Sequence, residues 1–180
     1  MSWHARWLPA LSLNDLDMIT IRRAQQEDSE SILQVHIRAI KEMCIGHYSQ
    51  EEVNLWSNVL KPGRYIKAIV RGPFFVATDG DAIVGFSNLN QKSGEVEAVY
   101  VDPGYVGLGV GRRLLQALEN EARDAGLTSL HLSASLNAVP FYEKAGYRSQ
   151  NHTKHLLPFG MVECVPMVKE MAAVAGEQSG

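Results

Sequence analysis

The spacing of apolar residues alternates along the chain between a helical period and a strand-like period. Helical spacing occurs in five segments, which are residues 28–44, 50–60, 65–70, 109–125 and 137–144. Segments rich in β-branched and aromatic residues, which are typical of strands, are residues 18–23, 74–78, 82–89, 94–101, 127–133 and 162–169. The pattern therefore predicts a mixed order of strands and helices with a run of three strands in the middle.

Three local patterns refine this order. Asp79-Gly80-Asp81 separates two strand-like segments and predicts a hairpin. Pro62 and Gly63 are expected to break the chain between the second helix and a short third one. In the strand at 94–101, strict alternation would place Glu95, Glu97, Val99 and Val101 on one face and Val96, Ala98 and Tyr100 on the other.

The whole pattern predicts a single domain over residues 18–171. Residues 1–17 contain one short apolar patch, interrupted by Pro9, which is too short for a secretory signal. We expect these residues to form a poorly ordered extension and residues 172–180 to form a C-terminal tail. No segment approaches the roughly 20 apolar residues of a membrane-spanning helix, so we expect no membrane contact.

Composition and charge narrow the class of partner. The chain has 180 residues with 17 basic and 20 acidic side chains, a net charge of −3. This balance gives no overall electrostatic attraction to nucleic acid or to an anionic membrane surface. Cys44 and Cys164 have neither metal-ligand spacing nor a Cys-x-x-Cys pattern, which indicates two reduced thiols in a cytoplasmic protein. A small ligand that is recognised locally is the favoured partner.

Glycines are concentrated at the junction between the strand at 94–101 and the helix that follows it. Gly107, Gly109 and Gly111 stand there, followed by Arg112. Unpaired amides at a helix N-terminus attract anions, and glycine lets a large anion approach the backbone. Neither the dinucleotide nor the P-loop spacing of glycines fits. The alternative is a flexible loop with a tight helix start.

A second motif lies about 26 residues further on, and the two together resemble the GNAT acyltransferase superfamily. Residues 101–115, VDPGYVGLGVGRRLL, are similar to its pyrophosphate loop, and residues 135–147, SLNAVPFYEKAGY, to its pantetheine segment. Residues 21–32 weakly resemble its opening strand and helix. The resemblance covers residues 18–171. It implies a mixed, mostly antiparallel central sheet with helices on both faces and a splayed strand pair that forms an acyl-CoA cleft.

The resemblance also implies acetyl-CoA as the co-substrate. His152 and His155 have a spacing that could suit a metal, but no carboxylate or Cys pattern accompanies them, so no metal is expected. The residues expected to bind acetyl-CoA are Val99, Tyr100, Val101, Val106, Gly107, Leu108, Gly109, Val110, Gly111, Arg112, Asn137 and Tyr142. Most of the ligands in the loop would be backbone amides. Val106 departs from the Gln or Arg of the family pattern, and Arg112 or Arg113 could supply the missing charge. Asn137 could instead cap the short helix that follows it.

Acetyl transfer to an amine requires a neutral nucleophile and a leaving thiol. At pH 7 an amine with a pKa near 10.4 is at a disadvantage of about 4 to 5 kcal/mol, so a base is more important than an acid. Glu97 is the preferred candidate base and Glu95 is the second candidate, although either could be a solvated strand residue. The matching tyrosine of the family acts as the acid, which implies that role for Tyr142. Its alternative is a core aromatic.

The acceptor site is the least defined part of the prediction. The resemblance places it between the first two helices and the loop before the last strand. Candidate lining residues there are Ile45, His47, Tyr48, Trp56, His152, His155 and Phe159. Two functions follow: an N-acetyltransferase acting on a small-molecule or peptide amine, and a regulatory module that binds an acyl-CoA without turnover. A homodimer is left open, and no nucleic-acid partner is expected.

Overall fold

The computed structural model describes residues 18–150, 153–157 and 160–171, and the expected extension at 1–17 and tail at 172–180 lie outside them. The strands are β1 Ile19–Arg23, β2 Phe74–Asp79, β3 Ala82–Asn90, β4 Glu95–Val101, β5 Ser129–Ser135, β6 Arg148–Ser149, β7 Thr153–Leu157 and β8 Gly160–Glu170. The α-helices are α1 Ser29–Met43, α2 Gln50–Asn58, α3 Pro62–Arg71, α4 Val110–Asp124 and α5 Val139–Lys144. Short 3-10 turns are η2 Gln26–Asp28, η3 Pro103–Tyr105 and η4 Leu136–Ala138.

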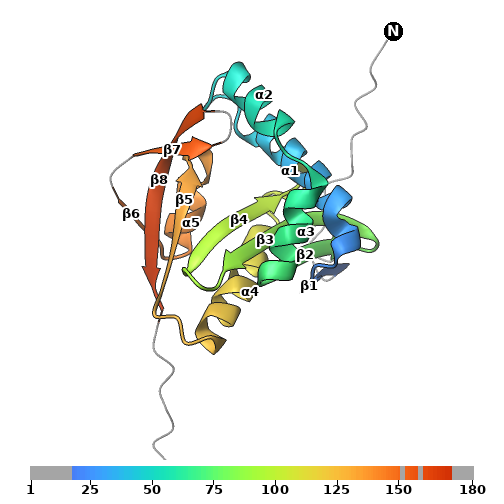
Figure 1. The fold of residues 1–180 in the computed structure, drawn as a ribbon, viewed down its shortest axis with the longest axis vertical. Coiled ribbons are helices and arrows are strands. Elements are labelled where there is room, and N and C mark those ends of the chain that lie inside the picture. The colour runs from blue at the N-terminus through green and yellow to red at the C-terminus, as the bar shows by residue number, and fades with distance from the viewer. Residues whose placement is uncertain (1–17, 151–152, 158–159, 172–180) are drawn as a thin grey trace, which may run out of the picture.

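The strands form one mixed sheet, as the sequence predicted. Its order is β1-β2-β3-β4-β5-β8-β6, with β7 paired to β8. Every neighbouring pair is antiparallel except β4 and β5. Figure 1 shows the sheet as two groups, with β1 to β4 on one side and β5 to β8 on the other.

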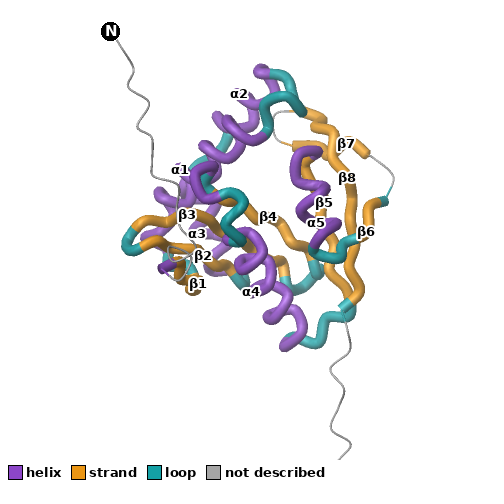
Figure 2. The backbone as a smooth tube through the Cα atoms, turned by 180° about the vertical axis from the view of Figure 1, so that it is seen from behind, coloured by secondary structure: helices purple, strands orange, loops and turns teal. Residues whose placement is uncertain are grey.

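Helices cover both faces of the sheet. α4 packs on β1 to β4 through Leu114, Leu115 and Leu118, which are spaced for one helix face and fully buried. The opposite face carries α1 and α3, and α2 packs on α1. Figure 2 shows α4 and α5 from behind. The two apolar layers therefore hold the sheet between them.

The two groups of strands meet only at one end of β4 and β5. Glu95 opposite His131 is their single paired position, and the amide of His131 donates to the Gly94 carbonyl at 3.0 Å. β4 is paired with β3 along its length, and β5 is likewise paired with β8. Beyond the shared end, the facing edges of β4 and β5 separate, which is the splay that the family resemblance implied.

A β-bulge in β4 corrects the expected alternation of that strand. Asn88 of β3 is opposite Ala98 and Leu89 is opposite Val96, so Glu97 is an extra residue on β4. Because a bulge shifts the pleat by one residue, Val96 lies in the same apolar layer as Val99, whereas Ala98 faces the other layer. Strict alternation from residue 95 to residue 101 was therefore wrong.

Two other details of the elements differ from the prediction. The expected interruption between the second and third helices is present, but it lies at residues 59–61, and Pro62 is the first residue of α3, where a missing amide hydrogen costs nothing. The short strands β6 and β7 were not predicted. No helix within 18–150, 153–157 and 160–171 is both long and apolar enough to cross a membrane.

Candidate active site

The glycine-rich loop presents backbone amides at the start of α4. Gly107 has φ +86° and Gly109, the N-cap, has φ +78°, a left-handed conformation that glycine adopts without steric cost. The first helix amide with a main-chain acceptor is that of Arg113, which donates to the Gly109 carbonyl at 3.1 Å. Among the described residues, the amides from Gly107 to Arg112 have no hydrogen-bond acceptor. The loop thus has the donors and the helix dipole that bind an anion.

Polar contacts fix the entry to this loop. The Asp102 carboxylate accepts from the Gly104 amide at 3.0 Å and from Nε of Arg38, on α1, at 2.7 Å. Tyr105 donates its hydroxyl hydrogen to Asp79 of the β2–β3 hairpin at 2.8 Å. The loop is therefore joined to a helix on one side and to a hairpin on the other before α4 begins.

A cavity of about 360 Å³, here called the coenzyme cavity, lies beside the loop. It runs between the separated edges of β4 and β5 and is bordered by α1, α4 and α5. The predicted binding residues that line it are Val99, Tyr100, Val101, Val106, Gly107, Gly109, Gly111, Arg112, Asn137 and Tyr142. Leu108 and Val110 do not line it, because their side chains pack into the core under α4. Ten of the twelve predicted residues therefore surround one cavity, Leu108 and Val110 could contribute only backbone groups, and coenzyme binding itself stays a prediction.

Tyr142 is buried in the wall of the coenzyme cavity. It packs edge-on between the rings of Phe141 and Tyr147, at centroid distances of 4.9 and 5.7 Å. Burial raises the pKa of the Tyr142 hydroxyl far above its usual value. The side chain is both a core aromatic and a neutral hydrogen-bond donor at physiological pH, so the two interpretations of this residue are compatible.

Asn137 contributes its side chain to the same cavity. The Cys44 thiol donates to its Oδ1 at 3.7 Å. The N-cap of α5 is Ala138, and no side chain caps that helix, so a capping role for Asn137 is excluded. Neither Cys44 nor Cys164 forms a disulfide, as predicted; both thiols are buried, and burial raises the pKa of Cys44 to about 11.

A larger cavity of about 670 Å³, here called the acceptor cavity, opens on the other side of β4. Tyr48 and Trp56 line it, as predicted. Ile45 and His47 are exposed and do not line it. His152 and Phe159 lie outside the described residues, and His155 is described only as a strand position opposite Val162.

Tyr48 joins the loop between α1 and α2 to the second group of strands, beside the acceptor cavity. Its hydroxyl donates to the Glu163 carbonyl of β8 at 2.8 Å and accepts from the Leu136 amide, at the end of β5, at 3.0 Å. Desolvation raises the pKa of this hydroxyl to about 12, so it remains protonated. The loop between α1 and α2 is thereby fixed to the far side of the splay.

Glu97 lies where the two cavities meet. It lines both of them, together with Val96, Ala98, Tyr100, Ser133 and Ser135. Its Oε2 accepts hydrogen bonds from Arg71 of α3 and from Nδ2 of Asn88. Oε1 has no partner within the described part of the chain. Glu95 lines only the acceptor cavity, so the structure separates the two candidate bases.

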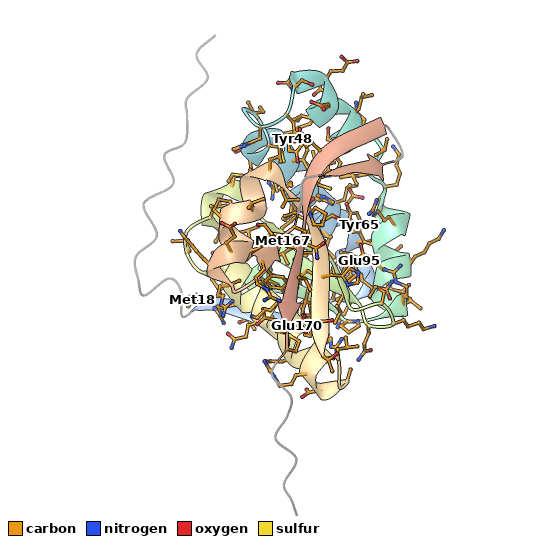
Figure 3. All side chains as sticks on the ribbon, turned by 90° about the vertical axis from the view of Figure 1, so that its left-hand side faces the viewer. Met18, Tyr48, Tyr65, Glu95, Met167 and Glu170 are labelled. Carbon is orange, nitrogen blue, oxygen red and sulfur yellow. The ribbon has the colours of Figure 1, made fainter. Side chains whose placement is uncertain are left out.

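An aromatic group forms one wall of the acceptor cavity. His36 packs on Tyr100 with the two ring centroids 3.9 Å apart, and its Nδ1 lies 2.9 Å from the Tyr65 hydroxyl. Its Nε2 is buried with no hydrogen-bond partner in the described residues. Desolvation, with a smaller effect from Arg64, lowers the pKa of His36 to about 3, so the ring is neutral. Figure 3 shows Tyr65 and Glu95 on the same side of the molecule.

The arrangement of a splayed strand pair, an amide-rich loop and two adjoining cavities agrees with comparisons to known proteins. The sequence model of the GNAT acetyltransferase domain matches residues 44–171, more than half of the chain. The chain belongs to the GNAT acetyltransferase family. It is therefore an acetyltransferase, in agreement with the prediction from the two motifs.

A curated relative supports this family, and solved structures have the same fold. The chain is 31% identical over 135 residues to the peptidyl-lysine N-acetyltransferase YjaB of Salmonella typhimurium, covering 73% of this chain and 84% of that protein. A GCN5-related N-acetyltransferase from Rhodopseudomonas palustris superposes with a TM-score of 0.78 at 26% identity, covering 84% and 94% of the two chains. PaiA N-acetyltransferase from Thermoplasma acidophilum, in complex with coenzyme A, superposes with a TM-score of 0.73 at 22% identity, covering 84% of this chain and 98% of that one.

Sequence reasoning missed several residues of this acetyltransferase. Ser133 and Ser135 line both cavities because β5 is splayed from β4, and Met43 and Cys44 reach the coenzyme cavity from the end of α1. The cavity-facing side of α3 was also missed. Its three basic residues are spaced for one helix face, which would have been the signal, but the helix was expected to start only at residue 65.

Proposed function

We propose that this acetyltransferase transfers the acetyl group of acetyl-CoA to a primary amine by direct attack. The observation that carries the proposal is that one carboxylate, Glu97, lines both the coenzyme cavity and the acceptor cavity. An acetyl donor on one side of β4 and an amine on the other would meet at this residue. Close approach of the two reactants accounts for a large part of the rate in such transfers.

The coenzyme cavity has the features that acetyl-CoA requires. Amides from Gly107 to Arg112 would bind its diphosphate, and Arg112 offers a positive charge beside them. The exposed edge of β4 offers main-chain groups to the pantetheine amides. Bound acetyl-CoA supplies the acetyl group as a thioester, whose thiol leaves more easily than an amine would.

Glu97 is suited to remove the proton that keeps the amine unreactive. Arg71 and Asn88 both hold Oε2, so the carboxylate is fixed in orientation while Oε1 is left to accept a proton from the amine, directly or through a water molecule. Glu95 is the alternative base, because it also lines the acceptor cavity. Glu97 is preferred because Glu95 does not line the coenzyme cavity.

Tyr142 would act at the opposite end of the reaction. Its protonated hydroxyl, in the wall of the coenzyme cavity, can give a proton to the sulfur as the carbon–sulfur bond breaks and the carbon–nitrogen bond forms. The nitrogen loses a second proton as the amide forms, which balances the proton that Tyr142 supplies. Solvent then reprotonates the tyrosine.

Primary amines are also the acceptors named for two relatives. One is the peptidyl-lysine enzyme of Salmonella, and the other is a glucosamine 6-phosphate N-acetyltransferase of Trypanosoma brucei brucei. These two acceptors have only the primary amine in common. They therefore support acetyl transfer to an amine as the reaction type, but they do not indicate which amine this protein uses.

A two-part experiment tests the proposal. Thermal unfolding with acetyl-CoA measures binding, and release of free thiol over a broad panel of amines measures transfer. We expect stabilisation together with amine-dependent thiol release. Stabilisation without release on any amine would instead support a module that binds acyl-CoA without turnover.

A further inference from the structure

One face of α3 is basic and borders the acceptor cavity. Arg64, Lys67 and Arg71 follow one another at intervals of three and four residues, which places them on the same side of the helix. All three side chains line the cavity, and all three remain exposed to solvent at its opening.

The charges around this cavity are not all paired with one another. Arg71 is held by Glu97. Arg64 and Lys67 have no ion pair within the described residues, and neither does Glu95 across the cavity. Glu163 also lines the cavity, from β8. The helix side of the cavity therefore has two basic side chains, Arg64 and Lys67, that form no ion pair within the described residues, and the strand side has carboxylates.

The wall beneath these charges is aromatic, with one polar atom that is not used by the fold. His36, Tyr65, Phe86 and Tyr100 pack together there. Nε2 of His36 is buried without a partner in the described part of the chain, although His36 lines the cavity. A buried polar atom of this kind usually has a partner, and a bound ligand can supply one.

We propose that the acceptor is a small amine that also carries an anionic group, a carboxylate or a phosphate, which Arg64 and Lys67 bind while the amine reaches Glu97. The inference rests on the proposed function, since it names the acceptor class of the same site. A cavity of about 670 Å³ holds a small molecule, and its cationic side disfavours a lysine-rich peptide.

The test uses the full chain, acetyl-CoA and a series of 2-aminoethyl compounds that differ only in their head group. Ethanolamine carries a neutral group, β-alanine a carboxylate, taurine a sulfonate and O-phosphoethanolamine a phosphate. Because a charge-assisted hydrogen bond is worth more than a neutral one, kcat/KM for an anionic member should exceed that for ethanolamine by about tenfold or more. Comparing β-alanine with O-phosphoethanolamine shows whether the acceptor's anionic group is a carboxylate or a phosphate.

Variants assign this preference to the two residues. Arg64→Gln and Lys67→Gln should each raise KM for the preferred anionic amine by about tenfold, while KM for ethanolamine stays within about twofold. Lys61→Gln is the matched control, because Lys61 precedes α3 as its N-cap and does not line the cavity. Calorimetric titration of the anionic amine into the coenzyme A complex gives a readout that does not depend on turnover.

The outcomes separate the two proposals. Turnover that is equal across the head groups, or highest for ethanolamine, overturns this inference and leaves the proposed function intact. An anionic preference that survives in the Arg64→Gln/Lys67→Gln double variant overturns the assignment to α3. No thiol release with this series or with the broad amine panel counts against the proposed function itself.

Discussion

Replacing Gly109 with alanine should weaken coenzyme binding through the backbone alone. Gly109 has φ +78°, and a Cβ added there would meet no atom within 4 Å. The substitution therefore creates no clash, and the cost is that of holding an L-residue in the left-handed region, about 1 to 2 kcal/mol. Because Gly109 is exposed, the unliganded loop can relax, and this cost must be met when coenzyme A binds.

A penalty of this size corresponds to a roughly 5- to 30-fold rise in Kd. Calorimetric titration with coenzyme A measures it directly. Gly126→Ala is a closely matched control, because Gly126 follows the other end of α4, has φ +73° and would likewise place an added Cβ with no atom within 4 Å. It should lower thermal stability without changing the coenzyme Kd.

A Gly109→Ala variant that binds coenzyme A with a Kd within twofold of that of the unmodified protein would contradict a role for the left-handed backbone at this position. A Gly126→Ala variant that weakens binding as much as Gly109→Ala does would also contradict it, because the effect would then come from general loosening of α4. A loss of coenzyme affinity confined to Gly109→Ala is the expected result.

Three further predictions concern the reacting groups and the buried histidine. Tyr142→Phe should lower kcat about 100-fold and leave the coenzyme Kd within about twofold, since it removes one proton donor and little packing; an unchanged kcat would exclude Tyr142 as the acid. Glu97→Gln should reduce the rate about 100-fold at pH 7 and progressively less as pH rises, because alkaline solution deprotonates the amine without a base; a deficit constant with pH would point to Glu95 or to water. For His36, unfolded chains bind a proton below about pH 6.5, whereas the folded chain does so only near pH 3, so stability should fall by up to about 1.4 kcal/mol per pH unit as pH drops through this window. Denaturant unfolding at several pH values should show a shallower fall in His36→Gln, and an identical slope would contradict the pKa argument.

Features that depend on local sequence were predictable. The apolar stripe of α4 and the glycines before it lie within one continuous segment, so their spacing alone places the helix start and the exposed amides. The hairpin at Gly80 is equally local, with φ +55° at the glycine that the turn needs. Asn137 and Tyr142 were placed by the second motif, and both do line the coenzyme cavity.

Features that depend on pairing between distant segments were not predictable. The bulge at Glu97 arises from the register of β4 against β3, which no pattern within β4 reveals. The contacts of Glu97 with Arg71 and Asn88 join three elements that are separate in sequence, so they could be identified only from the folded structure. The basic face of α3 was missed for a local reason, because Pro62 is equally typical of a helix stop and of the first residue of a helix.

A crystal structure of the complex with coenzyme A would locate the bound diphosphate. We predict that the diphosphate oxygens lie within hydrogen-bond distance of the main-chain nitrogens between Gly107 and Arg112, with the sulfur end of the molecule near Tyr142 and Glu97. A diphosphate bound elsewhere, with that turn making no contact to the coenzyme, would contradict this prediction.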